Sequence, residues 1–165
     1  MSFLEQTEGF AHTILSSYVI KPEDTLIIFS NSGINALPVE LCDLANRQSL
    51  TTISVGSTQH AMANQPKNPL GKRLCEIADI HIDNHIPEGD TLVTLEGGIR
   101  TGGGSTIAAM VIMNAIVVAT VHRLNQQGLP FHIYPSHNVS GEELQDVIQK
   151  EAALFEAHKR LISKL

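Results

Sequence analysis

Short apolar runs along this chain alternate with segments in which apolar residues recur at helical spacing. The run 25–29 is continuously apolar after its first residue, a pattern typical of a strand buried on both faces of a parallel sheet. The runs 50–55 and 80–83 predict the next two strands, and 91–95 and 131–134 predict a fourth and a last one. Strands alternating with helices predict an α/β fold with a mainly parallel sheet and right-handed crossovers.

Helices are predicted between and beside these strands, at 2–18, 36–46, 70–78, 107–121 and 141–165. The first is expected to bury Phe3, Phe10, Ile14 and Leu15. The second places Leu37, Leu41 and Leu44 along one face. It can accommodate Pro38 because that residue falls in the first turn, where its missing N–H has no helical partner.

The segment 107–121 is almost wholly apolar, so it has to be considered as a membrane span. It runs for only about 15 residues, whereas a helix that crosses a bilayer needs roughly 20. A helix that is apolar on every face belongs in a core or a subunit interface. We therefore expect a central buried helix, no membrane association, and a homodimer or a larger homo-oligomer.

Length and composition narrow the classes of function. The 165 residues are enough for a single domain, 1–165, with a proper hydrophobic core. A formal charge of −6 and an aromatic content of 4% argue against nucleic-acid binding through a basic surface or stacked bases. Cys42 and Cys75 lie far apart and form no paired motif, which fits buried thiols in a reducing, cytoplasmic location.

Three loops after predicted strands are rich in small hydroxyl, amide and glycine residues: Ser30-Asn31-Ser32-Gly33, Gly56-Ser57-Thr58 and Gly102-Gly103-Gly104-Ser105-Thr106. Hydroxyls and free N–H groups at a helix N-terminus suit a phosphate, because the helix dipole and the unsatisfied donors both favour an anion. The loops contain no lysine and no G-x-x-x-x-G-K-[ST] motif, so a nucleoside triphosphate with magnesium is a poor candidate and no cofactor is predicted. The same residue types also cap helices and form turns without any ligand, so this alternative stays open.

The stretch Ser30-Asn31-Ser32-Gly33-Ile34-Asn35, directly after a buried strand, resembles the S-x-S-G-x-T signature of the SIS (sugar isomerase) phosphosugar-binding domains. The segments FSNSGINALPVEL, NPLGKRLCEIADIHIDNHIPEGD and STIAAMVIMNAIV are similar to a bacterial branch of SIS proteins. The similarity runs from about Phe10 to Asn138. It implies a flavodoxin-like, three-layer αβα sandwich that binds sugar phosphates.

The resemblance also implies roles for individual residues. Ser30 and Ser32 would donate their hydroxyls to the phosphate, while Asn31 and Gly33 would offer backbone N–H groups. Asn35 stands where many SIS domains have Thr, and its amide would donate to the ligand or cap the helix. The remaining ligand contacts would come from the other two loops, at Ser57, Thr58, Ser105 and Thr106.

A SIS domain normally begins with an earlier strand and a loop of the G-x-G-x-S type, which completes the sugar pocket. Nothing before Thr25 resembles that unit. The resemblance therefore implies an N-terminally truncated domain whose missing unit is absent or supplied by another chain.

Isomerisation of an aldose or ketose phosphate needs a base, usually Glu or His, to move a proton between adjacent carbons. The candidates are Glu40, His60, Glu96 and His137. Each of them also fits an ordinary surface or loop side chain.

The sequence H-I-D-N-H brings His81 and His85 close together along the chain and raises the question of a metal site. No third ligand has a suitable spacing, so no metal is predicted.

Three functions stay open at this point. The chain could bind a sugar or amino-sugar phosphate and isomerise it, or it could be a sensor or inactive remnant that uses the same loop without a base. It could also be an association module in which 107–121 packs in a subunit interface. Loss of turnover with retained binding in a base variant would favour the first, and binding without turnover the second. A concentration-dependent oligomer with neither property would favour the third.

Overall fold

The computed structural model describes residues 2–133 and 143–162 of the chain. The chain divides into two compact units. The first is formed by Met1–Ser16 and Ile20–Ala115, and the second by Ser17–Val19 and Ile116–Leu165.

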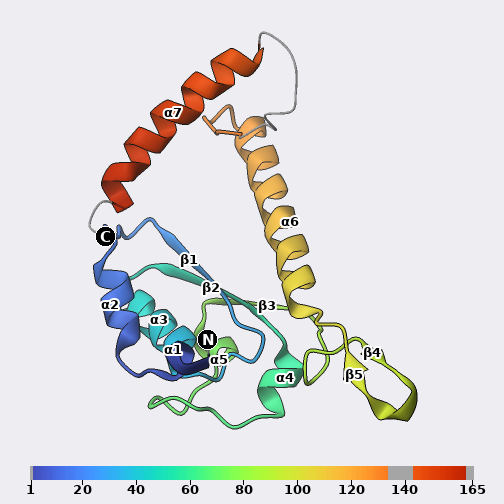
Figure 1. Cartoon of the computed structure of the whole chain (residues 1–165). Helices are drawn as coiled ribbons and strands as arrows, with labels where there is room; N and C mark the ends of the chain where they lie inside the picture. The colour runs from blue at the N-terminus through green and yellow to red at the C-terminus, as the bar shows by residue number, and fades with distance from the viewer. Residues whose placement is uncertain (1, 134–142, 163–165) are drawn as a thin grey trace. The chain divides into compact units, whose positions relative to one another are not determined.

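A parallel sheet of three strands forms the centre of the first unit (Figure 1). The strands are β1 (Thr25–Phe29), β2 (Thr51–Gly56) and β3 (Ile80–Asp83), and they lie in the order β1-β2-β3. The bounds of β1 and β3 are those predicted from the sequence, and β2 is shifted by one residue. The α/β class with a mainly parallel sheet is confirmed.

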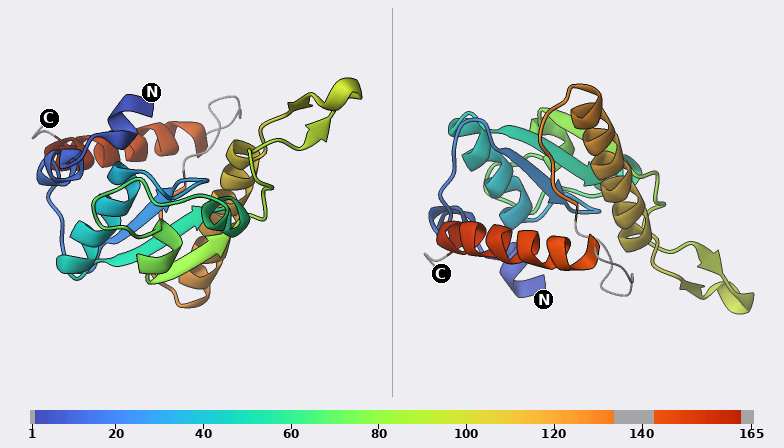
Figure 2. Two further views of the ribbon diagram at one scale, coloured as in Figure 1. Left: turned by 90° about the horizontal axis from the view of Figure 1, so that it is seen from below. Right: turned by 90° about the horizontal axis from the view of Figure 1, so that it is seen from above.

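Helix α3 (Ala36–Arg47) and the short helix α5 (Leu74–Ile77) cover one face of this sheet (Figure 2). The core on this face is formed by Ile28, Val39, Cys42 and Leu74. The buried line of α3 consists of small residues, which let the helix approach the sheet closely: Ala36, Val39, Cys42 and Ala45. The leucines predicted to share a face, Leu37, Leu41 and Leu44, are only half-buried beside this line.

The opposite face of the sheet carries the alternate residues of each strand: Ile27, Phe29, Ile53, Val55, Ile80 and Ile82. It is less completely covered, since Phe29 is 42% and Ile80 is 49% exposed. Helix α6 (Ser105–Gln126) begins beside this face, where its Ala109 shares a cavity lining with Phe29 and Val55. Of the two helical layers implied by an αβα sandwich, the one formed by α3 and α5 is the better developed.

The prediction that 107–121 forms a central buried helix is wrong for the described residues. Helix α6 has no buried residue, and side chains such as Ile107, Met110 and Val111 are each more than 60% exposed. The segment is apolar on all sides, but the described elements leave it uncovered. By length and composition α6 could also cross a membrane, a weak criterion that the core helices of soluble proteins meet as well.

The predicted helix 2–18 is two helices, α1 (Ser2–Gln6) and α2 (Phe10–Ser16). Gly9 separates them with a φ of 76°, a backbone conformation that favours glycine. Both helices pack on α3, and the Gly9 N–H donates to Glu40 Oε2 at 2.8 Å. The expected burial holds fully for Leu15, partly for Phe10 and Ile14, and not for Phe3.

The predicted fourth parallel strand at 91–95 is wrong. Its central residues form β4 (Val93–Thr94), which pairs antiparallel with β5 (Arg100–Thr101) around a 3₁₀ turn, η1 (Glu96–Gly98). Gly97, Gly98 and Gly102 have positive φ and favour this tight reversal over a crossover. The resulting hairpin is exposed along its length and projects from the sheet (Figure 1).

The remaining helices and strands agree less well with the elements predicted from the sequence. Helix α4 (Thr58–Met62) follows β2 directly, and α5 is shorter than the predicted helix 70–78. Residues 131–133 form no strand, and Tyr134 lies outside the described residues. In the second unit, α7 (Glu143–Ile162) lies within the predicted helix 141–165.

A buried polar network joins α3, β2 and the start of β3. Thr52 is 0% exposed; its hydroxyl donates to Asn46 Oδ1 at 2.8 Å and accepts from the Asp79 N–H at 3.0 Å. The Thr52 N–H donates to Asp79 Oδ2 at 2.8 Å, and Asn46 Nδ2 donates to the Ile77 carbonyl at 2.8 Å. Because every member is satisfied, the network fixes the position of α3 against the sheet without leaving an orphaned polar group.

Candidate functional site

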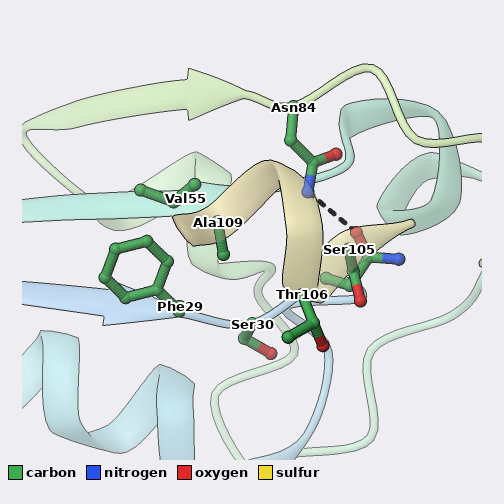
Figure 3. A pocket seen from close by; sticks show the side chains of 8 residues that line it. Phe29, Ser30, Val55, Asn84, Ser105, Thr106 and Ala109 are labelled. Atoms are coloured by element: carbon green, nitrogen blue, oxygen red, sulfur yellow. Dashed lines mark hydrogen bonds between the residues drawn. The ribbon is translucent and has the colours of Figure 1, made fainter. Parts of the chain in front are cut away.

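The carboxyl ends of the strands and the first turn of α6 enclose a cavity of about 160 Å³ (Figure 3). Its lining combines three apolar side chains with polar, uncharged ones: Phe29, Ser30, Asn31, Val55, Asn84, Ser105, Thr106 and Ala109. This is the edge of a parallel sheet at which ligands bind in open α/β folds.

The loop after β1 is held in a defined conformation. Gly33 has a φ of 58°, its N–H donates to Ser30 Oγ at 3.2 Å, and its carbonyl accepts from the Leu74 N–H at 2.8 Å. On the other side, Gly56 lies so close that a Cβ there would stand 2.3 Å from the Ser30 carbonyl oxygen. The two glycines therefore let the loop pack between β2 and α5 and keep it rigid.

Several donors of this loop are left without a partner. Within the part of the chain that the structure describes, the Ser32 hydroxyl and the backbone N–H groups of Asn31 and Ser32 make no hydrogen bond. The loop leads into α3, whose N-terminal cap residue, Asn35, makes no side-chain capping bond. Free donors at the start of a helix of this length suit an anion.

Ser32 and Gly33 border a second, smaller cavity of about 10 Å³, which they share with Ser30 and Asn31. A cavity of that size holds about one water molecule. Ser30 and Asn31 thus connect the free donors of the loop to the larger cavity.

The second loop differs from the sequence expectation. The Ser57 side chain is 1% exposed, donates to the Ile86 carbonyl at 2.5 Å and accepts from the His60 N–H at 3.0 Å as the cap of α4. The Thr58 hydroxyl bonds to His81 Nε2 at 3.1 Å, and the Thr58 N–H donates to Asp83 at 3.2 Å. Both hydroxyls are therefore engaged within the fold; neither residue lines the larger cavity, and Ser57 borders only the smaller one.

At the third loop, the N-terminus of α6 is capped by a carboxylate of the chain itself. Asp90 Oδ1 accepts from the N–H groups of Gly104 and Ser105 at 3.0 and 2.8 Å, and the Ser105 hydroxyl donates to Asp90 Oδ2 at 2.6 Å. Burial raises the pKa of Asp90, but the hydrogen bonds from Ser105 and Gly104 outweigh it and hold the pKa below its usual value. The Thr106 hydroxyl makes no hydrogen bond to any described residue and lines the cavity.

His81 is held between two hydroxyls on the helix-covered side of β3. Its Nδ1 lies 2.8 Å from Ser54 Oγ and its Nε2 lies 3.1 Å from Thr58 Oγ1. Burial lowers the pKa of His81, partly opposed by the Asp83 carboxylate, which favours the neutral form of the ring. Among the described residues no three His, Cys, Asp or Glu side chains are placed to hold a metal ion.

The structure does not bring the candidate bases together. Glu40 accepts from the Gly9 N–H, and His60 Nδ1 accepts from the Gly89 N–H at 3.0 Å. Glu96 lies in η1 on the projecting hairpin, and His137 lies outside the described residues. None of the three described candidates lines the larger cavity.

Asn35 is also engaged elsewhere. Its Nδ2 donates to Glu5 Oε2 of α1 at 3.0 Å, and Asn35 does not line the larger cavity.

Sequence reasoning missed Asn84 as a member of the site. Its Nδ2 donates to Asn31 Oδ1 at 3.0 Å (dashed line in Figure 3). Its own Oδ1 accepts from the Ile86 N–H at 3.0 Å. Its position in the sequence could have indicated this role. Asn84 directly follows β3 as Ser30 directly follows β1, and the carboxyl ends of parallel strands meet at one edge of the sheet.

The architecture and the site define the chain as an α/β protein with an uncharged, donor-rich pocket at the carboxyl edge of its sheet. Residues 1–57 match the family model of the SIS domain. Among curated proteins, the UPF0309 protein of Halalkalibacterium halodurans is 31% identical over 144 residues, which cover 87% of this chain and 60% of that protein. The UPF0309 protein of Shouchella clausii is 29% identical over 162 residues, covering 98% of this chain and 64% of the relative.

A UPF0309 protein from Brucella anthropi gives a similar result, with 30% identity over 154 residues, 90% of this chain and 61% of the relative. Residues 1–57 are thus similar to a SIS domain, and the chain as a whole is similar to UPF0309 proteins. It spans 60% to 64% of the length of these relatives.

Proposed function

We propose that the chain binds the phosphate of a phosphorylated sugar or amino sugar at the loop Ser30-Asn31-Ser32-Gly33. The observation that carries this proposal is the set of unpartnered donors on Asn31 and Ser32, placed at the start of α3 beside an uncharged cavity. A phosphate dianion would satisfy these donors and gain from the helix dipole. The match of residues 1–57 to the SIS-domain model supports the same ligand class.

The cavity has room for only part of such a ligand. About 160 Å³ is close to the volume of a cavity that accommodates benzene, so it would take the phosphate or a few carbons of a hexose phosphate. The rest of the ligand would extend from the mouth of the cavity. A second copy of the chain, or a segment of it, would then complete the enclosure.

Catalysis needs a base that reaches the ligand. No carboxylate or imidazole lines the cavity among the described residues, which favours a sugar-phosphate sensor or binding module when the chain acts by itself. An aldose–ketose isomerase is the alternative, and its base would have to come from outside the cavity lining, for example from a second subunit. Binding without turnover in any condition would decide for the sensor.

Self-association is part of the proposal, because α6 exposes a continuous apolar surface that includes Ile107, Met110 and Val111. Exposed apolar surface of this kind marks an interaction site. Sedimentation velocity should therefore show a dimer or a larger oligomer, and Val111→Glu should shift it toward monomer. A wild-type chain that stays monomeric at high concentration would contradict this part of the proposal.

The binding proposal is tested by thermal unfolding of the full chain with glucose 6-phosphate, fructose 6-phosphate and glucosamine 6-phosphate, against the parent sugars and inorganic phosphate. A ligand at one hundred times its dissociation constant adds roughly 2.7 kcal/mol to the free energy of unfolding, a readable rise in Tm. Ser32→Ala should abolish the rise, while Ser16→Ala, which removes an exposed hydroxyl of α2, should not. The proposal fails if no phosphorylated sugar raises the Tm of the wild-type chain.

A further inference from the structure

The amides of Asn31 and Asn84 form a pair at the carboxyl edge of the sheet, and both line the larger cavity. Asn84 lies directly after β3, and Asn31 lies in the loop after β1. Their hydrogen bond of 3.0 Å spans the end of β2, the central strand.

The orientation of both amides follows from one backbone group. The Ile86 N–H can only donate, so the Asn84 atom that faces it at 3.0 Å is the carbonyl oxygen. Asn84 therefore presents its NH₂ group to Asn31, and Asn31 must accept with its own carbonyl oxygen. We call this series of hydrogen bonds, from the Ile86 N–H through Asn84 to Asn31, the amide relay. It ends on Asn31 Nδ2, which is a donor. The Asn31 amide cannot turn to present its carbonyl oxygen there while Asn84 donates to that oxygen.

Asn31 Nδ2 is buried and has no hydrogen-bond partner among the described residues. A buried donor without an acceptor is unfavourable, and such groups are rare in native structures. Another amide of the same fold shows the contrast, because Asn46 uses its Nδ2 for the Ile77 carbonyl and its Oδ1 for Thr52. An amide pair with a purely structural role would be satisfied at both ends in the same way.

We propose that Asn31 Nδ2 is a ligand donor and that Asn84 is the positioning residue that keeps it turned as a donor. This inference rests on the proposed phosphosugar site and deepens it, because it assigns the Asn31 side chain a contact beyond its backbone N–H. The ligand atom that meets Asn31 is an acceptor, which fits an oxygen of the phosphate and excludes an ammonium group at that position. Ser30 and Thr106 supply hydroxyls around the same cavity.

Asn84→Asp tests the relay with little change of shape. The new carboxylate still accepts from the Ile86 N–H, but it can no longer donate to Asn31. Asn31 then turns its NH₂ group toward residue 84, which keeps the pair bonded and presents Oδ1 where the ligand needs a donor. Asn31→Asp gives the same outcome from the other side of the pair, since Asn84 still donates to it while the free donor is lost.

The experiment measures affinity by calorimetry for inorganic phosphate and for the three hexose 6-phosphates named above, in the full chain. The variants are Asn84→Asp, Asn31→Asp and the control Gln48→Glu, which adds the same charge at the exposed C-terminal end of α3, the end opposite the loop after β1. We expect the first two to weaken the best-bound sugar phosphate at least tenfold and the control to leave it unchanged. Measuring at low and high salt separates charge repulsion, which salt screens, from the loss of the donor, which it does not.

A readout of the amide itself accompanies the titration. In the wild-type chain the side-chain NH₂ resonance of Asn31 should shift when the sugar phosphate binds, and in Asn84→Asp the resonance should lie at a different position before any ligand is added. A tenfold loss that persists in high salt, together with these shifts, supports the proposal.

The outcomes separate this inference from the function on which it rests. If the wild-type chain binds a sugar phosphate and Ser32→Ala abolishes binding, but both amide variants bind as tightly as wild type, the amide relay is wrong and the phosphosugar site stands. If losses in the variants vanish at high salt, they are charge effects and the relay is again wrong. If the wild-type chain binds none of the four probes, the function and the relay are both overturned.

Discussion

The carboxylate of Asp90 accepts two hydrogen bonds from Ser105, one from its backbone N–H at 2.8 Å and one from its hydroxyl at 2.6 Å. The N-terminus of α6 therefore already holds a negative group from its own chain. This arrangement shifts the expected anion site away from α6 and toward the loop after β1, where the donors are unpartnered. Thr106, one residue further along, keeps its hydroxyl available to the cavity.

Asp90→Ala should lower the free energy of unfolding by about 1–2 kcal/mol, because loss of a helix cap costs that much and the N–H groups of Gly104 and Ser105 lose their acceptor. Denaturant unfolding would measure the change. Glu23→Ala, which removes an exposed carboxylate away from any helix start, serves as the control and should change stability by less than about 0.5 kcal/mol. Equal stability of Asp90→Ala and wild type would show that the cap contributes nothing.

Gly56→Ala should be severely destabilising, since the added Cβ would meet the Ser30 carbonyl oxygen at 2.3 Å and neither backbone segment can yield cheaply. We expect a loss of roughly 2–4 kcal/mol from overpacking, together with loss of sugar-phosphate binding because the loop after β1 is displaced. Gly103→Ala is a matched control, because its φ is not positive and its nearest contacts lie at an ordinary 3.9 Å. Unfolding midpoints of the two variants that coincide would contradict this account of the loop.

Ser57→Ala should lower the stability of the fold without weakening ligand binding. The buried hydroxyl links the cap of α4 to the Ile86 carbonyl, so its removal should cost about 1–2 kcal/mol of stability. Affinity for the sugar phosphate should stay within about twofold of wild type, in contrast to Ser32→Ala, because the Ser57 hydroxyl is already bonded to the Ile86 carbonyl and the His60 N–H. A large loss of affinity in a folded Ser57→Ala chain would restore Ser57 as a ligand contact.

His81 should make the stability of the fold depend on pH. Its pKa in the folded chain is lowered by burial below the value of about 6.5 in the unfolded chain, so in that range the unfolded state binds more protons. The contribution is fully present above pH 6.5 and is lost as the pH falls below it toward the folded pKa. Unfolding free energies between pH 7.5 and 5.5 should fall less steeply in His81→Gln than in wild type, and parallel curves would exclude this role for His81.

The sequence was sufficient for the elements whose pattern is set by their own residues. The apolar run of β1 and the small-residue loop behind it predicted the strand, the turn and the start of α3 almost to the residue. The second strand and the third were found in the same way. These segments pack against the strands and helices next to them in chain order, such as β1 against α3 and β2, so the sequence pattern and the final environment agree.

Where the structure depends on distant partners, the pattern misled. Residues 91–95 are apolar enough for an internal strand, but the glycines that follow reverse the chain and make an exposed hairpin. The apolarity of α6 predicted burial, although no described element covers it. Hydropathy indicates that an apolar segment is expected to pack against another surface, but it does not identify that surface.

The candidate site was predicted in part. The loop after β1 and Thr106 do meet at one cavity, because strand ends in a parallel sheet share an edge. Composition could not reveal that the hydroxyls of Ser57 and Ser105 are used inside the fold, since a serine that caps a helix and one that binds a phosphate look alike in sequence. The pairing of Asn31 with Asn84 joins residues 53 positions apart and becomes visible only in three dimensions.

The order β1-β2-β3 has a consequence for how the fold opens. β2 is paired on both sides, whereas β1 and β3 are each paired within this sheet on one side only. Amide protons of β2 should exchange with solvent only when the whole sheet comes apart, while those at the outer edges can exchange through smaller excursions. The two asparagines that flank the candidate pocket follow the outer strands, so local breathing of either edge would change the pocket long before the centre of the sheet unfolds.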